Sequence, residues 1–237
     1  MAGTASISWI GNPAPVGVSF VSYTDVTSGF GTNSSPRSTA SISVNNGDTL
    51  VAVGAIEGQA LVGAETIAIA GGGLVWNNDQ YVNAQDFVVA YSWSTTATST
   101  TSFTVTFTRT ASNNLLWWGG GVYVFRNSTG IGATNKTNVN GGAPTLSLNV
   151  TANNSTIVTV NGDWSAQDGT SRTWNTINSI TPTIGNGLEK IYFRNSSHYS
   201  AYSAYWNDVG ASGSKSTGIS APGSQKYSII SVEVKGS

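Results

Sequence analysis

The chain has 237 residues, a length that a single β-sandwich domain can reach and that can bury a large core. Only 9% of the residues are charged, against about 25% in an average globular protein, and the net charge is −1. No run of Lys or Arg offers the basic surface that nucleic acid or an anionic membrane needs, so neither partner is expected. The absence of cysteine excludes disulfides, thiolate nucleophiles and cysteine-based zinc sites.

Alternation with a period of two residues dominates the chain, in short runs of β-branched and aromatic residues bounded by Gly, Asn and Asp. No segment carries a helical apolar stripe over three turns. We therefore predict an all-β fold, an antiparallel β-sandwich or jelly roll, formed by one domain over residues 1–237. The predicted strands are 6–10, 18–26, 39–44, 49–56, 66–70, 74–77, 87–93, 102–108, 118–125, 145–150, 156–161, 191–193, 199–206, 215–220 and 227–234.

Turn signals separate these runs. Asn-Gly-Asp at 46–48 and again at 161–163 predicts hairpin turns, and the glycine triplet at 71–73 predicts a third turn. A second glycine triplet, at 119–121, directly follows two tryptophans and enters a strong strand, so we expect a β-bulge there.

The stretch 135–142, rich in Asn and Gly, joins two halves of similar character. Each half contains a turn followed by a similar strand, Thr-Leu-Val-Ala-Val at 49–53 and Thr-Ile-Val-Thr-Val at 156–160. We interpret this likeness as a general property of sheet sequences rather than as a repeat.

Residues 1–10 lack both the basic start and the apolar run of a signal peptide, and no apolar stretch approaches the roughly 20 residues of a membrane span. A surface rich in Ser, Thr and Asn without an export signal fits a protein that is assembled in a host cytoplasm and released by cell lysis.

Seven segments together resemble β-sandwich domains of minor virion proteins of tailed bacteriophages, which are also found in bacterial surface proteins. The segments are NGDTLVAV (46–53), FVVAYSW (87–93), SFTVTF (102–107), GVYVFR (121–126), NSTIVTV (154–160), GASGSKS (210–216) and YSIISVEV (227–234). The resemblance covers about residues 45 to 235 and leaves 1–44 as N-terminal strands or an arm outside the pattern. It implies a structural or adhesive role and transfers no active-site residues.

Groups for catalysis are few. The single histidine is His198. The sequence contains no Gly-x-Ser-x-Gly motif whose serine this histidine could activate, and we interpret His198 as a turn residue. Asp163 and Asp168 place two carboxylates and a tryptophan in one loop. Three interpretations of this loop are possible: a catalytic pair of a glycosidase, a Ca²⁺-binding loop, or a solvated turn without a further role. We expect no cofactor and no enzymatic activity; Ca²⁺ is the one metal for which the sequence offers candidate ligands.

Aromatic side chains are the candidates for ligand contact. Strand alternation places Tyr202 and Trp206 on one face of their strand and Tyr199 and Tyr205 on the other, so one pair is expected at the surface. Trp117 and Trp118 should likewise point to opposite sides. Exposed rings among small residues can stack on sugars or dock a neighbouring subunit.

These patterns favour a non-enzymatic structural protein of a tailed-phage virion, either a minor tail protein or a capsid decoration protein. We expect it to contact other virion proteins, to form a homo-oligomer and to be a candidate for binding host-surface glycans. The alternative is a free carbohydrate-binding module or lectin, and a glycosidase is a third hypothesis.

Overall fold

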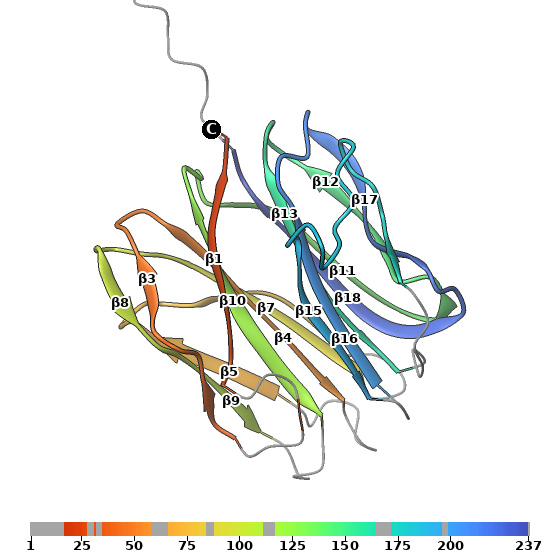
Figure 1. Ribbon diagram of the computed structural model, residues 1–237, viewed down its shortest axis with the longest axis horizontal. Coiled ribbons are helices and arrows are strands. Elements are labelled where there is room, and N and C mark those ends of the chain that lie inside the picture. Colours follow the sequence, from red (N-terminus) through yellow and green to blue (C-terminus); the bar gives the residue numbers. More distant parts are fainter. Residues whose placement is uncertain are drawn as a thin grey trace, which may run out of the picture.

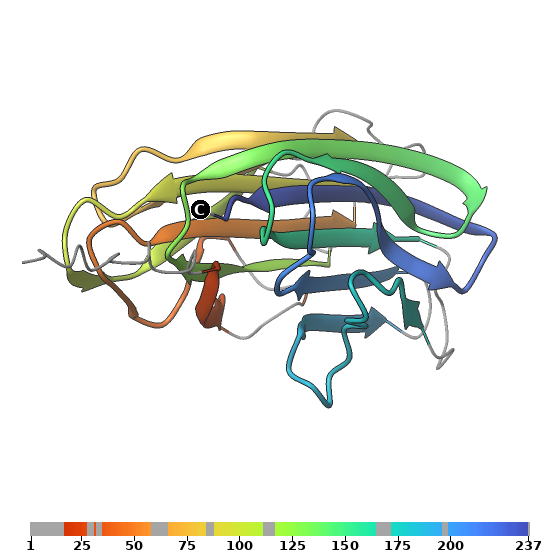
Figure 2. The ribbon, with the colours of Figure 1, turned by 90° about the horizontal axis from the view of Figure 1, so that it is seen from above.

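The computed structural model describes residues 17–27, 31, 35–57, 66–83, 88–110, 117–164, 172–195 and 199–236. All regular secondary structure in these ranges is β-strand (Figure 2), and the strands pair in antiparallel sheets, which confirms the predicted all-β fold class. The predicted strand at 6–10 lies outside the described residues. Within the described part of the chain, no helix is long and apolar enough to cross a membrane.

The first half of the chain contains β1 (Ser19–Asp25), β2 (Arg37–Ser38), β3 (Ile42–Val44), β4 (Thr49–Glu57), β5 (Thr66–Gly71), β6 (Asn77–Asn83), β7 (Val88–Thr96), β8 (Thr101–Phe103), β9 (Val105–Thr110) and β10 (Trp118–Arg126). The second half contains β11 (Ile131–Gly142), β12 (Thr145–Val150), β13 (Thr156–Asp163), β14 (Thr173–Trp174), β15 (Glu189–Asn195), β16 (Tyr199–Trp206), β17 (Gly213–Ala221) and β18 (Gln225–Val234).

The sheets lie side by side in four layers (Figure 1). The two inner layers are five-stranded sheets with the strand orders β1-β10-β4-β7-β6 and β11-β18-β13-β16-β15. The outer layer of the first half holds β2-β9-β5 and β3-β8, and that of the second half holds β12-β17-β14. The inner sheets are therefore covered on both faces.

This covering explains why the inner strands are apolar almost continuously. In β4, Val51 and Val53 face the cluster between the inner sheets, whereas Leu50 and Ala52 face the cluster under the outer layer of the first half. Each side of the strand is thus a core side, as in sheets that are buried on both faces.

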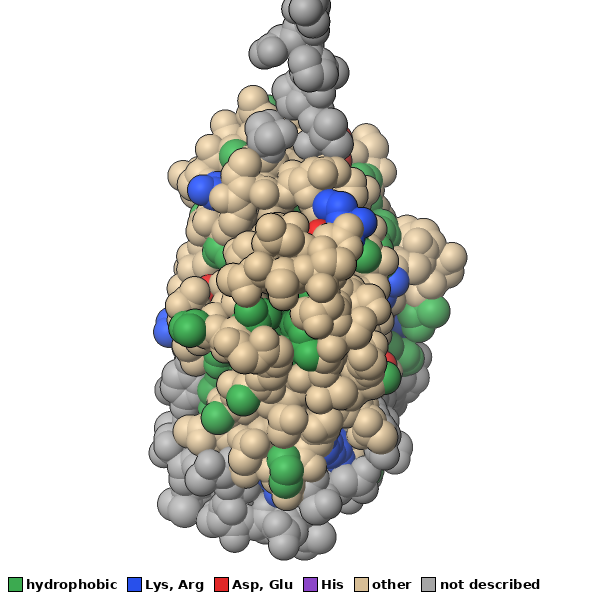
Figure 3. Space-filling view, turned by 90° about the vertical axis from the view of Figure 1, so that its left-hand side faces the viewer, with side chains coloured by type: hydrophobic (Ala, Val, Ile, Leu, Met, Phe, Trp, Pro, Cys, Tyr) green, Lys and Arg blue, Asp and Glu red, His purple; other side chains and the backbone are tan. Residues whose placement is uncertain are grey.

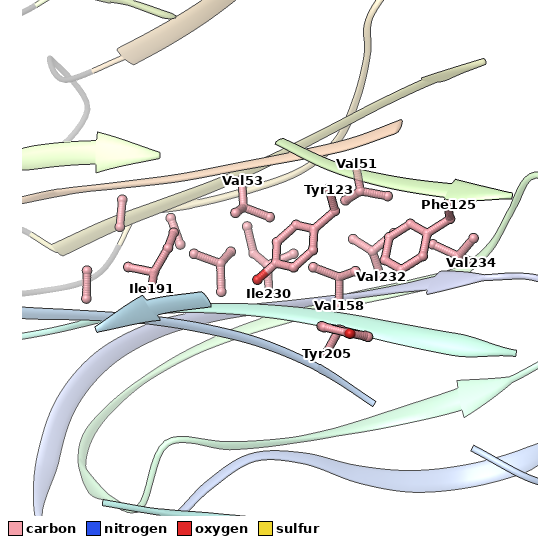
Figure 4. Packing of buried hydrophobic residues seen from close by; sticks show 14 of the residues in the cluster. Val51, Val53, Tyr123, Phe125, Val158, Ile191, Tyr205, Ile230, Val232 and Val234 are labelled. Carbon is pink, nitrogen blue, oxygen red and sulfur yellow. The ribbon is translucent and has the colours of Figure 1, made fainter. Parts of the chain in front are cut away.

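The two inner sheets share one core, shown in Figure 4. Tyr123 and Phe125 of β10 point from the first half toward Val158 and Tyr205 of the second. The Tyr123 hydroxyl and the Ser203 hydroxyl form a buried hydrogen bond of 2.7 Å between the sheets. Burial of apolar side chains is the main source of folding free energy. Because both halves contribute side chains to this core, each half stabilises the other.

The two halves repeat one topology. Strands β1, β10, β4, β7 and β6 have the same neighbours in the first sheet as β11, β18, β13, β16 and β15 have in the second. The similar segments 49–53 and 156–160 are the equivalent central strands β4 and β13, so our interpretation of their likeness as a general sheet pattern was wrong. The extent of the domain, 1–237, stays a prediction.

The equivalent turns before β4 and β13 also match. Gly47 and Asn154 both have positive φ, 87° and 53°. Gly47 N–H donates to the carbonyl of Ala97 at 2.8 Å, and Asn154 N–H donates to the carbonyl of Gly210 at 2.8 Å. Asn and Gly are the residues that adopt this backbone conformation at least cost.

The two halves also contact each other at the edges of the shared core. Phe20 of β1 stacks on Tyr205 of β16 at 4.6 Å on one side of the interface. On the opposite side, β6 approaches β11, where the Gln80 amide donates to the Thr134 hydroxyl at 2.7 Å. Strands at both edges of the first inner sheet, β1 and β6, therefore contact the second half.

Two predicted hairpins and the predicted bulge are wrong. The turn at 46–48 is present but does not close a hairpin, because β3 pairs with β8 whereas β4 pairs with β7 and β10. The triplet 119–121 is not a bulge, since Trp118 to Phe125 pair with β4 without a register shift. A Cβ at Gly120 would lie 2.4 Å from the Val53 carbonyl oxygen, so the glycine admits the neighbouring strand. Likewise Asn-Gly-Asp at 161–163 is no hairpin but the end of β13, paired on both sides.

Several strands also differ from the prediction. The predicted strand 74–77 is wrong except at its last residue, because β6 begins at Asn77. The stretch 135–142 belongs to the edge strand β11, whose exposed residues show no alternation to predict it from. The predicted strand 102–108 is divided at Thr104, because β8 pairs with β3 and β9 pairs with β2 and β5.

Candidate binding site on the edge strand of the second half

Three aromatic residues of β16, Tyr202, Tyr205 and Trp206, point as the alternation predicted, but all three are buried. Tyr202 and Trp206 lie in the cluster under the outer layer of the second half, with 3% and 0% of their surface exposed. Tyr205, 6% exposed, lies in the shared core between the inner sheets. The expected surface platform is therefore wrong for these three residues, because their sheet has a layer on each face. Tyr199 begins β16 opposite Asn195, and its side chain lies outside the described part of the structure.

Trp117 and Trp118 also point to opposite sides, and Trp118 is fully buried. The guanidinium of Arg37 lies 4.6 Å above the Trp118 ring and donates to the Trp118 carbonyl at 2.8 Å, so this tryptophan anchors β2 to β10. Trp117 is half-buried and stacks on Phe193 of β15 at 5.1 Å. Ligand binding by Trp118 is thus excluded by its burial, whereas Trp117 reaches the rim of the shared core.

Asp163 ends β13 beside Ser200 of β16 and Tyr227 of β18, and it is 1% exposed. Asp168 and His198 lie outside the described residues, so the Ca²⁺ loop and the paired carboxylates stay predictions. Among the described residues, no group of three or more His, Cys, Asp or Glu side chains could hold a metal ion.

One aromatic ring of this region does reach solvent. Tyr192 of the edge strand β15 is 41% exposed and stacks on its cross-strand neighbour Tyr202, with 5.9 Å between the ring centroids. The Arg172 guanidinium lies 3.4 Å from the centroid of the Tyr192 ring and forms an ion pair with Glu189. We call Arg172, Glu189, Tyr192 and Tyr202 the β15 site.

A β-bulge positions the site. The register between β15 and β16 shifts between Glu189 and Ile191, so that one extra residue, Lys190, is accommodated there. After the bulge, Ile191 and Phe193 face the shared core, and Tyr192 faces the opposite side, beside Tyr202.

The loop before β15 is held by one asparagine. Asn186 Oδ1 accepts hydrogen bonds from the N–H groups of Thr183 and Leu188 at 2.9 and 3.2 Å, and its amide donates to the Thr181 carbonyl at 2.9 Å. This network fixes the loop that leads into the bulge and leaves Ile184 59% exposed at its tip.

Electrostatics keep the charged pair in place. Burial raises the pKa of Glu189, and the hydrogen bond and charge of Arg172 partly offset that rise. Arg172 and Glu189 have side chains only 12% and 3% exposed. The buried carboxylate and the guanidinium therefore fix the orientation of the Tyr192 ring, and this ring is the part of the site that reaches solvent.

Sequence reasoning missed most of this site. Of its four residues, only Tyr202 is a candidate from the sequence, because Arg172, Glu189 and Tyr192 belong to no motif. The available signal was the rarity of charge, since Glu189, Lys190 and Arg194 flank the predicted strand 191–193 in a chain that is 9% charged. Arg172 is distant in the sequence and gave no signal.

No family model, no curated protein and no solved structure matches this chain.

Proposed function

We propose that the protein is a non-enzymatic structural component of a tailed-phage virion, a minor tail or capsid decoration protein. The observation that carries the proposal is its exterior. Figure 3 shows a face with few charged side chains, the kind of surface that packs against neighbours without strong repulsion. The resemblance of the strand and turn pattern to virion sandwich domains supports the same role.

The fate of the buried ionisable groups also supports a structural role. Glu233 is fully buried and accepts hydrogen bonds from the backbone N–H groups of Ala133, Thr151 and Ala152. Asp48 is 1% exposed and forms an ion pair with Arg126 at 2.8 Å. These carboxylates hold turns and strand ends in place, and such contacts suit a rigid building block.

Mass spectrometry of particles purified from a lysate of the host that carries the gene tests this proposal. We expect the chain in intact particles at a fixed ratio to the major capsid or tail subunit. Its absence from purified particles, with the protein present in the lysate, would overturn the virion role.

The second candidate function, a glycan-binding role in the virion or as a free lectin, is favoured by the β15 site. A partly exposed tyrosine whose orientation is fixed by a buried ion pair can contact the apolar face of a sugar ring. We expect the protein to bind on a glycan array and Tyr192→Ala to lose that binding. Ile184→Ala, which shortens another exposed apolar side chain, is the matched control and should bind normally. Equal binding by both variants would exclude the β15 site.

A further inference from the structure

Edge strands of sheets expose unpaired N–H and C=O groups, and stable proteins protect them from pairing with other chains. The edge strands of the two inner sheets all carry such protection. Each of these strands has a register shift and a charged residue that interrupt a flat edge. In the first sheet, β1 has a shift after Phe20 and ends with Asp25, and β6 has a shift after Asn78 and contains Asp79. In the second sheet, β11 has two shifts and contains Lys136, and β15 has one shift and contains Glu189, Lys190 and Arg194.

Most edge strands of the outer layers are protected because they are short or because a side chain of a neighbouring strand binds their edge. Strands β2 and β14 have two residues, and β3 and β8 have three. Strand β12 is longer, but the side-chain amide of Asn135 on β11 donates to the carbonyl of Ser147 at 2.7 Å and occupies its edge. None of these edges offers a long, regular row of backbone groups.

Strand β5 differs from all of these. Its six residues, Thr-Ile-Ala-Ile-Ala-Gly, carry no charge, and they pair with β9 residue by residue without a shift, from Thr66 to Gly71. Ile67 and Ile69 face the core cluster of the first half, and Ala68 and Ala70 face outward and are exposed. The order β2-β9-β5 ends at β5, so no described strand pairs with its other side (Figure 1).

We propose that β5 pairs with β5 of a second copy of this chain. In an antiparallel pair related by a two-fold axis through the sheet, residues directly opposite each other share a face. Centred on Ala68, the pairing places Ala68 opposite Ala68 and Ile67 opposite Ile69. The two outer sheets β2-β9-β5 then join into one continuous sheet across the seam.

The absence of charge on β5 favours a second copy of this chain as the strand that pairs with its free edge. Strand β15 paired with itself about its centre would bring Lys190 against Arg194, whereas β5 brings no like charges together. The isoleucines of both copies meet on the core-facing side, so the apolar cluster of each first half continues across the seam. The contact uses the same strand in both copies, so it closes at two copies and does not propagate. Pairing through β5 requires neither the virion role nor glycan binding.

Measuring the mass of the full chain in solution tests the proposal. We expect sedimentation velocity to give a dimer at about 100 μM, a concentration that populates even an interface of low affinity. Ala68→Lys adds a charge at the centre of the seam and should give a monomer with an unchanged circular dichroism spectrum. Val21→Lys adds the same charge at a partly exposed position of the β1 edge, and this control should remain dimeric.

A cysteine at the centre of the seam provides a second readout that is independent of the lysine variants. Opposed cross-strand Cβ atoms lie about 4.5 to 5.5 Å apart, close to the separation that a disulfide spans. Because the chain has no cysteine, Ala68→Cys should form a disulfide-linked dimer on oxidation, and Val21→Cys should not. A wild-type monomer at every concentration, or an Ala68→Lys dimer, would refute the pairing, as would equal crosslinking of the two cysteine variants.

Discussion

The buried carboxylate of Glu233 provides the sharpest stability prediction. It accepts hydrogen bonds from three backbone N–H groups at 2.7 to 3.0 Å and from the hydroxyls of Thr151 and Ser155, both at 2.8 Å. Glu233→Gln keeps the shape and replaces one acceptor oxygen with a donor. In either orientation of the amide, the N–H of Ala133 or of Ala152 loses its acceptor and faces another donor.

The magnitude follows from these contacts. A buried donor without an acceptor costs about 1 to 3 kcal/mol, and hydrogen bonds to a charged group contribute about 1.5 to 3 kcal/mol each. We therefore expect Glu233→Gln to lower the free energy of unfolding by about 2 to 5 kcal/mol at pH 7. That loss is a large fraction of the total stability of an ordinary domain. Urea titration measures this loss, and we expect the slope of the unfolding free energy against urea concentration to be unchanged.

The pH dependence of this loss checks the reasoning. Backbone and hydroxyl donors lower the pKa of Glu233 despite its burial. A lowered folded-state pKa contributes stability above the unfolded-state value and loses it as the pH falls through the folded-state value. The difference between wild type and Glu233→Gln should therefore shrink below about pH 4. Asp208→Asn, at an exposed turn, is the matched control and should change stability little. A loss at pH 7 no larger than that of the control would refute the account, as would a loss independent of pH.

Three further predictions concern single side chains. Burial raises the pKa of Asp79 to about 6, so its contribution to stability is present below its unfolded-state value and lost as the pH rises through about 6. Asp79→Asn should be more stable than wild type by about 1 to 2 kcal/mol at pH 7 after allowance for solvent screening, with no gain at pH 4, as measured by urea titration. Gly121→Ala should destabilise by about 1 to 3 kcal/mol, because its Cβ would lie 2.2 Å from the Tyr23 hydroxyl oxygen, whereas Gly223→Ala meets open space and should be neutral by thermal melting. Tyr123→Phe removes the hydrogen bond between the inner sheets and should cost about 1 kcal/mol in the same assay; no loss would show that this bond adds nothing.

Strand alternation predicted the directions of side chains but not what covers them. In β16, Tyr202 and Tyr205 do point to opposite sides, as expected from a period of two. Their burial depends on two further layers, one contributed by the other half of the chain and one by β14 and β17. No local pattern records that covering, because the contacts join residues far apart in the sequence.

The β15 site was beyond sequence reasoning for a related reason. Arg172, Glu189 and Tyr192 come together through a register shift in β15 and a loop held by Asn186. A shift of one residue decides which side of a strand faces solvent, and the sequence Glu-Lys-Ile-Tyr shows no sign of where that shift falls.

In both halves a carboxylate accepts a hydrogen bond from a backbone N–H group of the same turn, although the carboxylates come from different positions. The turns before β4 and β13 each have an N–H group, of Asn45 and of Ala152, that a carboxylate satisfies at 2.7 and 3.0 Å. In the first half the carboxylate is Asp48 on the turn, and its partner Arg126 ends β10.

In the second half the roles are exchanged. The carboxylate is Glu233 on β18, the strand equivalent to β10, and the turn supplies the Ser155 hydroxyl at the position equivalent to Asp48. The geometry therefore needs a negative charge at this turn but not at a fixed position in the sequence. This freedom explains why the likeness of the halves is clear in the apolar strands 49–53 and 156–160, where core packing on both faces restricts the choice of residues.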